Sequence, residues 1–173
     1  MSAPVLDLSL VPPLGEPRPA PVPEVHETTL PNGLRLIVVP RPGVPLVELR
    51  LRVPFAAASR QAATHVARTS VLSGAVLFGT AAHDQLEIAQ LLQAHGGELS
   101  VSADADRMLF STTMLPGGLG AVLGVLAELL VAPTYPAGPV EAERSRVVER
   151  ITIARSQPGV IARSALEIGR AHV

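Results

Sequence analysis

Residues 64–80, THVARTSVLSGAVLFGT, decide how the rest of this chain is interpreted. Apolar residues recur at spacings typical of one helical face, so a core-facing helix is predicted; they are Val66, Val71, Leu72, Ala75 and Val76. The stretch ends in Leu-Phe-Gly-Thr and contains one histidine and no acidic residue. It therefore predicts a core helix that lacks the side chains of a metal site.

Upstream and downstream of this helix, period-two patterns predict strands. Pro31-Asn32-Gly33 lies between two apolar runs, and Asn-Gly in that setting predicts a tight hairpin. Three further stretches have strand patterns or strand compositions. The predicted strands cover residues 26–30, 34–40, 46–53, 98–103 and 107–114.

Four further segments carry helical signals. Asp84 favours the positive end of a helix dipole, and Gly96-Gly97 stops that helix. The other three segments are an apolar stretch ended by Pro133, a stretch beginning with Pro139 in its first turn, and a last segment from Pro158 onwards. The predicted fold class is α+β, a mostly antiparallel sheet with helices packed on one face.

Composition excludes several classes of function. The chain has 173 residues, about one domain, and no cysteine, so disulfides, thiolate metal sites and cysteine nucleophiles are excluded. Its net charge is -1, every basic residue is arginine, and aromatic residues make up 2%. We therefore expect neither nucleic acid nor a membrane as partner.

The predicted domain organisation has three parts. Residues 1–24 are rich in proline and predict a flexible leader, without the basic and apolar regions of a secretory signal, so a cytoplasmic location is expected. Residues 25–167 are predicted to form the globular domain, and residues 168–173 to derive from a sequencing adapter. The apolar stretch 119–132 contains Glu128 and is too short to cross a bilayer.

Several short motifs together resemble one family, the pitrilysin, insulinase and mitochondrial processing peptidases. They are Leu30-Pro31-Asn32-Gly33-Leu34, Leu77-Phe78-Gly79-Thr80, Gly96-Gly97, Asp104, Pro133-Thr134-Tyr135-Pro136 and Glu143-Arg144. The resemblance spans about residues 25–165 and implies the same α+β domain. It also implies a longer bacterial protein with a second, similar domain, of which this chain is an incomplete N-terminal part.

The resemblance also shows what this chain lacks. Family peptidases hold zinc with an inverted His-x-x-Glu-His motif and a distant glutamate. Counting back from Thr80 places the lost residues at Ser70, Ser73 and Gly74 or, alternatively, at Val71, Gly74 and Ala75. Glu143-Arg144 matches the start of the second motif, but its ligand position holds Arg150 and Glu149 is one residue short. We therefore expect no catalytic residue and no cofactor here, with zinc only in a catalytic partner.

The remaining candidate residues have structural interpretations. His65 is interpreted as a capping or surface residue, and His26, His83 and His95 as surface residues, because no pair has metal-ligand spacing. Asp104 and Asp106 suggest paired carboxylates but suit a turn better. Ser70 and Ser73 have no histidine base beside them, which argues against serine chemistry.

The strand after Gly96-Gly97 is the candidate binding element. Leu99, Ser100, Val101 and Ser102 are predicted to form an edge strand that pairs with an extended peptide, and the alternative is an ordinary edge strand. The resemblance implies a non-catalytic homologue that encloses peptide with a zinc-bearing peptidase subunit of the same family. A peptide-binding scaffold without such a partner is the first alternative, and an active peptidase with unusual ligands is the second.

Overall fold

The computed structural model describes residues 15, 22–54, 62–104 and 106–170. The chain divides into two compact units, residues 1–44 and residues 45–173. The predicted leader, residues 1–24, falls almost wholly outside the described residues. No helix in the described ranges is both long and apolar enough to cross a membrane.

The first unit contains the predicted hairpin. Strands β1 (His26–Thr29) and β2 (Arg35–Val38) pair antiparallel. Gly33 takes a positive φ of 84°, which favours glycine, and Asn32 Oδ1 accepts a hydrogen bond of 3.1 Å from the Leu34 N–H. The Asn-Gly prediction is confirmed, but β1 and β2 form a sheet of their own.

The second unit contains a three-stranded antiparallel sheet of order β3-β5-β4. Its strands are β3 (Val47–Pro54), β4 (Glu98–Ala103) and β5 (Arg107–Met114), so the central strand comes last in the chain. One face of β5 is buried through Met108, Phe110, Thr112 and Met114. The alternation predicted for β3 and β4 is confirmed, since their polar residues are exposed.

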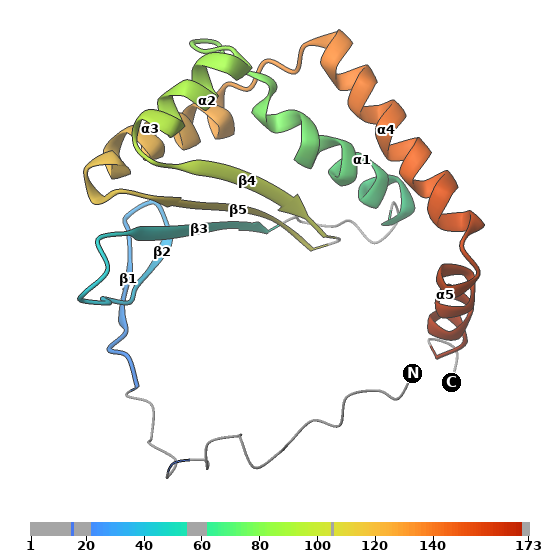
Figure 1. Cartoon of the computed structure of the whole chain (residues 1–173), viewed down its shortest axis with the longest axis horizontal. Helices are drawn as coiled ribbons and strands as arrows, with labels where there is room; N and C mark the ends of the chain where they lie inside the picture. The colour runs from blue at the N-terminus through green and yellow to red at the C-terminus, as the bar shows by residue number, and fades with distance from the viewer. Residues whose placement is uncertain (1–14, 16–21, 55–61, 105, 171–173) are drawn as a thin grey trace, which may run out of the picture. The chain divides into compact units, whose positions relative to one another are not determined.

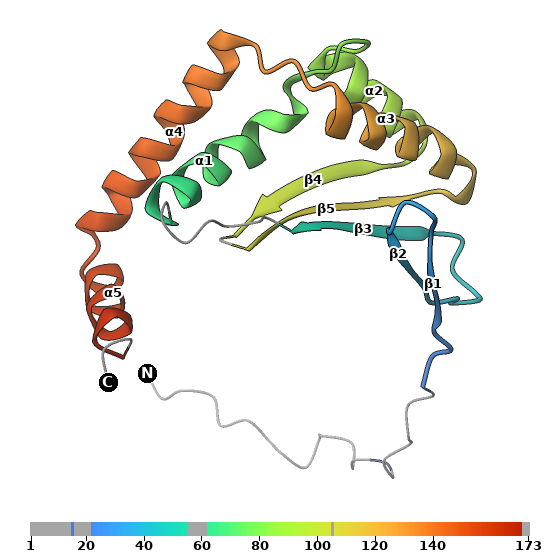
Figure 2. The same cartoon turned by 180° about the vertical axis from the view of Figure 1, so that it is seen from behind.

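Helices cover that buried face, as Figures 1 and 2 show from opposite sides. Helices α1 (Ala62–Ala75), α2 (Gln85–Ala94) and α3 (Leu119–Val131) lie over it, and α4 (Ala137–Ser156) and α5 (Pro158–Arg170) follow in the chain. The core joins α2, α3 and the sheet through Ile88, Leu92, Leu99, Phe110 and Val122. Helix α4 packs against α1, and α5 contacts α4. The predicted α+β fold with helices on one face is confirmed.

Local sequence signals explain both ends of α2. Asp84 caps α2, because its side chain accepts from the Glu87 N–H while the Glu87 carboxylate accepts from the Asp84 N–H. Gly96 takes a φ of 65° at the end of α2. The first helix differs from the prediction, because α1 begins at Ala62 and ends at Ala75, followed by the 3-10 turn η3 (Val76–Phe78).

The early end of α1 has a backbone cause. Gly79 takes a φ of 151° and its carbonyl accepts a 3.1 Å hydrogen bond from the Thr134 N–H, while Thr80 forms a bridge with Pro133. The segment after η3 is therefore tied to the segment after α3, and a continuous helix cannot make those bonds. A second 3-10 turn, η4 (Pro116–Gly118), leads into α3.

Candidate functional site

Strand β4 lies at an edge of the sheet, since among the described strands it pairs with β5 alone. Asp104 N–H donates to the Arg107 carbonyl at 3.0 Å, just beyond the Ala103–Met108 pair. Because hydrogen-bonded pairs alternate in an antiparallel ladder, Ser100 and Ser102 direct their backbone groups toward β5. The N–H and C=O groups of Leu99, Val101 and Ala103 therefore face the open edge.

Side chains of β4 alternate in the perpendicular direction. Leu99 is buried and Val101 and Ala103 are half-buried beneath the helices, whereas Ser100 and Ser102 are exposed. The residues that present backbone groups at the edge are thus the same residues that anchor the strand in the core. An added strand would not have to displace them.

A cavity of about 600 Å³ lies beside the second half of β4. It is formed by three elements, and its lining residues are Ser70, Ser73 and Gly74 of α1, Val101, Ser102 and Ala103 of β4, and Glu143, Val147, Arg150, Ile151 and Ala154 of α4. We call it the α1–α4 cavity. The positions predicted to match lost zinc-site residues share it with the predicted edge strand. In the alternative alignment, Val71 and Ala75 do not line it, and Ala75 is buried in the core.

Glu143 is the buried carboxylate of the α1–α4 cavity. Its side chain is only 7% exposed, and it accepts hydrogen bonds from Arg146 at 2.6 Å and from Arg150 at 3.3 Å. The carboxylate occupies the space above Gly74, because a Cβ built on that glycine would lie 2.5 Å from Glu143 Oε1. Two guanidinium groups balance the charge that would otherwise be costly to bury.

The α1–α4 cavity does not fit a zinc ion. It offers one carboxylate, already bonded to two arginines, together with serine hydroxyls and a guanidinium, which carries no lone pair for a metal. Nowhere in the described ranges do three or more His, Cys, Asp or Glu side chains gather where they would hold a metal. No catalytic step through zinc can be built from these residues.

The two α1 serines that line the cavity do not form a nucleophile site. The Ser70 hydroxyl donates to the Val66 carbonyl at 2.8 Å, and the Ser73 hydroxyl donates to the Ser70 carbonyl at 3.1 Å. Both hydroxyl protons are thus used inside α1, and no imidazole of the described residues lines the cavity. This geometry agrees with the sequence argument against serine chemistry.

A larger cavity, about 850 Å³, lies beside the first half of β4. Its apolar wall comes from η3 and α2, through Leu77, Ile88 and Leu92, and two carboxylates, Glu48 and Glu98, lie on its rim. We call it the α2 cavity. The open edge of β4 is therefore flanked by space for side chains along its whole length.

Comparison with known proteins identifies the family of this chain. The family model described as Insulinase (Peptidase family M16) matches residues 69–168, more than half of the chain. The chain belongs to the insulinase family. The match covers the second half of α1 together with β4 and α4, which are the elements that form the α1–α4 cavity.

Two similar bacterial proteins are longer than this chain. It is 24% identical over 135 residues to an uncharacterized zinc protease of Streptomyces coelicolor, covering 78% of this chain and 29% of that protein. It is 27% identical over 135 residues to an uncharacterized zinc protease of Mycobacterium leprae, covering 78% and 30% respectively. The chain therefore spans about a third of the length of these relatives.

A solved structure shares the fold. The peptidase M16 inactive domain from Pseudomonas fluorescens superposes with a TM-score of 0.71 at 23% identity, covering 83% of this chain and 35% of that one. At this identity the likeness concerns the fold alone. It confirms the α+β domain expected from the sequence motifs.

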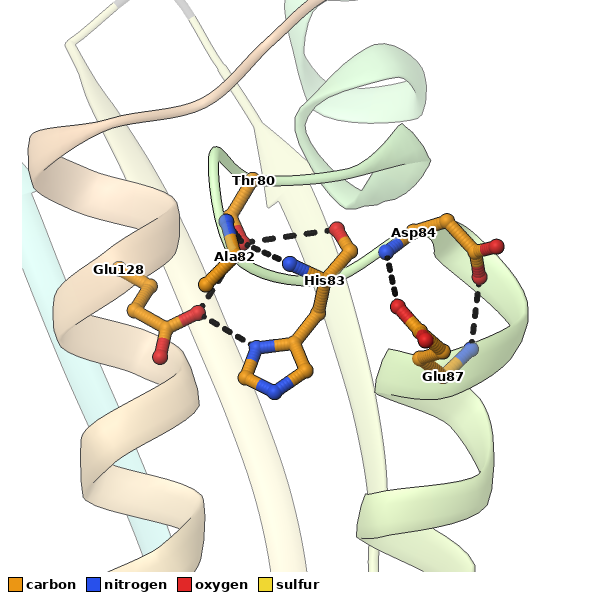
Figure 3. A network of polar contacts seen from close by, with 6 residues as sticks. All are labelled: Thr80, Ala82, His83, Asp84, Glu87 and Glu128. Carbon is orange, nitrogen blue, oxygen red and sulfur yellow. Dashed lines mark hydrogen bonds and ion pairs between the residues drawn. The ribbon is translucent and has the colours of Figure 1, made fainter.

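One polar network was missed by the sequence analysis, which interpreted His83 as a surface residue. Figure 3 shows Glu128 of α3 facing the turn after η3, where its Oε2 is 2.9 Å from His83 Nδ1 and 3.0 Å from Thr80 Oγ1. Thr80 Oγ1 in turn accepts from the N–H groups of Ala82 and His83. The bond to Glu128 raises the pKa of His83, and His83 and Thr80 lower the pKa of Glu128.

The other predicted residues have mixed outcomes. His26 is exposed as predicted, whereas His95 is half-buried and packs against Gly118, whose added Cβ would lie 2.5 Å from His95 Cβ. His65 is half-buried at the start of α1. The turn interpretation of Asp104 is confirmed, because its Oδ1 accepts from the Asp106 and Arg107 N–H groups and these bonds lower its pKa.

Proposed function

We propose that this chain is a non-catalytic member of the insulinase family that binds extended peptide on the open edge of β4. One observation carries the proposal: Arg150 is paired with buried Glu143 in the α1–α4 cavity, directly beside the peptide-pairing edge. A guanidinium at that place neutralises the carboxylate as a metal ion would, but it activates no water. Binding can then persist without hydrolysis.

The comparisons are compatible with loss of catalysis within this family. The two bacterial relatives are named zinc proteases, and the Pseudomonas fluorescens structure is described as an inactive domain. For this chain, the side chains of the α1–α4 cavity favour the absence of catalysis. The alternative of an active peptidase with unusual ligands has no candidate ligand set among the described residues.

We further propose that the chain pairs with a zinc-bearing subunit of the same family and that the two subunits together enclose the peptide. We also propose a cytoplasmic location. The support is the family and the exposed edge of β4, which offers binding but no hydrolysis. Sedimentation of the purified chain with such a subunit tests the pairing, and peptide cleavage by the mixture tests its effect. If the two proteins form no heteromer and the chain alone still binds peptide, the result would favour the scaffold alternative.

Peptide binding at the edge is tested by removing one N–H group. Val101→Pro deletes an N–H that faces the open edge and leaves the bonds to β5 in place, so peptide affinity should fall by about 1–3 kcal/mol. Val101→Ala is the matched control, because it shortens the side chain and keeps the N–H. Affinities come from titration of a labelled extended peptide, after circular dichroism shows that both variants melt cooperatively.

Two outcomes would count against the edge as the docking site. Equal affinity of the Val101→Pro variant and the wild type would show that this N–H is not used. Equal losses in the proline and alanine variants would assign the effect to the side chain instead. Ser102→Pro removes an N–H that points toward β5 and should lower stability as well as binding.

A further inference from the structure

We infer that the α1–α4 cavity selects peptides by an acidic side chain, which Arg150 binds when the peptide pairs with the second half of β4. This inference rests on the proposed peptide binding and adds the substrate class. It concerns a single residue of the peptide, which lies opposite either Val101 or Ala103.

The first step is the direction in which peptide side chains point. In an antiparallel or parallel pair, residues opposite each other place their side chains on the same face of the sheet. Val101 and Ala103 point toward the helices and line the α1–α4 cavity. A peptide residue opposite either of them therefore directs its side chain into the same cavity, toward Arg150.

The second step is the charge that this side chain meets. The Glu143 side chain is 7% exposed and both its oxygens are bonded to arginines, whereas the Arg150 side chain is 70% exposed. An entering group thus contacts the guanidinium and is screened from the carboxylate. The local sum of Glu143, Arg146 and Arg150 is one positive charge, which favours a carboxylate.

The third step is the hydrogen-bonding capacity of Arg150. A guanidinium has five N–H donors in a planar fork, and among the described residues Arg150 has one hydrogen-bond partner, Glu143, which its Nη2 contacts at 3.3 Å. The remaining donors of the fork can bind a second carboxylate. Pairing of the peptide with β4 removes water from this contact, which strengthens it.

The other end of β4 offers no positive charge on the helix side. Among the described residues that line the α2 cavity, Leu77, Ile88 and Leu92 form the apolar wall, none is cationic, and Glu48 and Glu98 lie on the exposed face of the sheet. An acidic side chain opposite Leu99 would therefore meet apolar residues and no cation. The preference should depend on where the acidic residue lies in the peptide, and not on net charge alone.

The test uses a set of fluorescent peptides of one composition, rich in Thr and Val, that differ only in the position of a single Asp. A second set carries Asn at the same positions. We expect one position at which Asp binds about tenfold tighter than Asn. Arg150→Gln should abolish that ratio, while Arg155→Gln, which removes an arginine of α4 outside the cavity, should keep it.

The Arg150→Gln variant should still fold, because Glu143 retains its bond to Arg146, and a thermal melt checks this. Equal binding of the Asp and Asn peptides to the wild type would overturn the inference and leave the proposed peptide binding intact. An Asp preference that survives Arg150→Gln, or that is the same at every position, would overturn it too. Absence of peptide binding would refute both the inference and the proposed function.

Discussion

Replacing Gly74 with alanine should destabilise the domain, although the same change stabilises most helices. A Cβ on Gly74 would lie 2.5 Å from Glu143 Oε1 and 2.6 Å from its carboxyl carbon. Forcing one methyl group into a packed site costs about 1–3 kcal/mol. Alanine returns about 1 kcal/mol of helix propensity, and the displaced Glu143–arginine pairs cost roughly the same. The net loss of unfolding free energy should therefore remain at about 1–3 kcal/mol.

The assay is thermal unfolding followed by circular dichroism, with Gly124→Ala as the control. Gly124 lies inside α3, and a Cβ there would meet nothing within 4 Å, so this variant should gain stability. Each kcal/mol corresponds to about 2–4 °C in Tm for a domain of this size. The double variant Gly74→Ala, Glu143→Ala should recover part of the loss. A Gly74→Ala variant as stable as Gly124→Ala would refute the packing of Glu143 over Gly74.

Three further outcomes are expected. Because the pKa of His83 is raised above 6.5 and that of Glu128 lowered below 4.5, their ion pair should stabilise the wild type relative to His83→Gln most between those pH values. The advantage should fade as pH rises through the raised pKa or falls through the lowered one, and a pH-independent difference in Tm would contradict the pair. After dialysis, elemental analysis should find no stoichiometric zinc; one zinc per chain, lost in His65→Ala, would overturn this expectation. Gly33→Ala should strain the hairpin turn at φ 84° by about 1 kcal/mol and speed exchange of the Leu34 amide proton, and unchanged exchange would argue against the positive φ.

The sequence predicts the parts of this fold that depend on neighbouring residues. Strand β4 begins and ends where the alternation predicts, at Glu98 and Ala103, and α2 begins after the capping residue Asp84. The end of α1 at Ala75 could not be predicted in this way. It depends on hydrogen bonds between Gly79 and Thr134, which are far apart in the chain.

The candidate site likewise has features that the sequence predicts and features that it does not. The positions predicted to match zinc ligands follow from counting within a motif, and the seven-residue spacing already places Glu143 and Arg150 on one face of α4. Burial of Glu143 does not follow from that spacing, because it depends on Gly74 of another helix. The bond between His83 and Glu128 joins residues 45 positions apart, and neither has a local pattern that indicates it.

Gly79 has a consequence for how such a chain can diverge. Its φ of 151° is strained for any residue with a Cβ, which would also lie 3.1 Å from Thr134 Oγ1 and 3.3 Å from the His83 carbonyl. A substitution there would damage folding whether or not the protein has a chemical activity. Residues 70, 73 and 150 lie in helical backbone, which imposes no such restriction on the side chain. The glycine of the helix exit is therefore needed for the fold itself, independently of any metal chemistry at those positions.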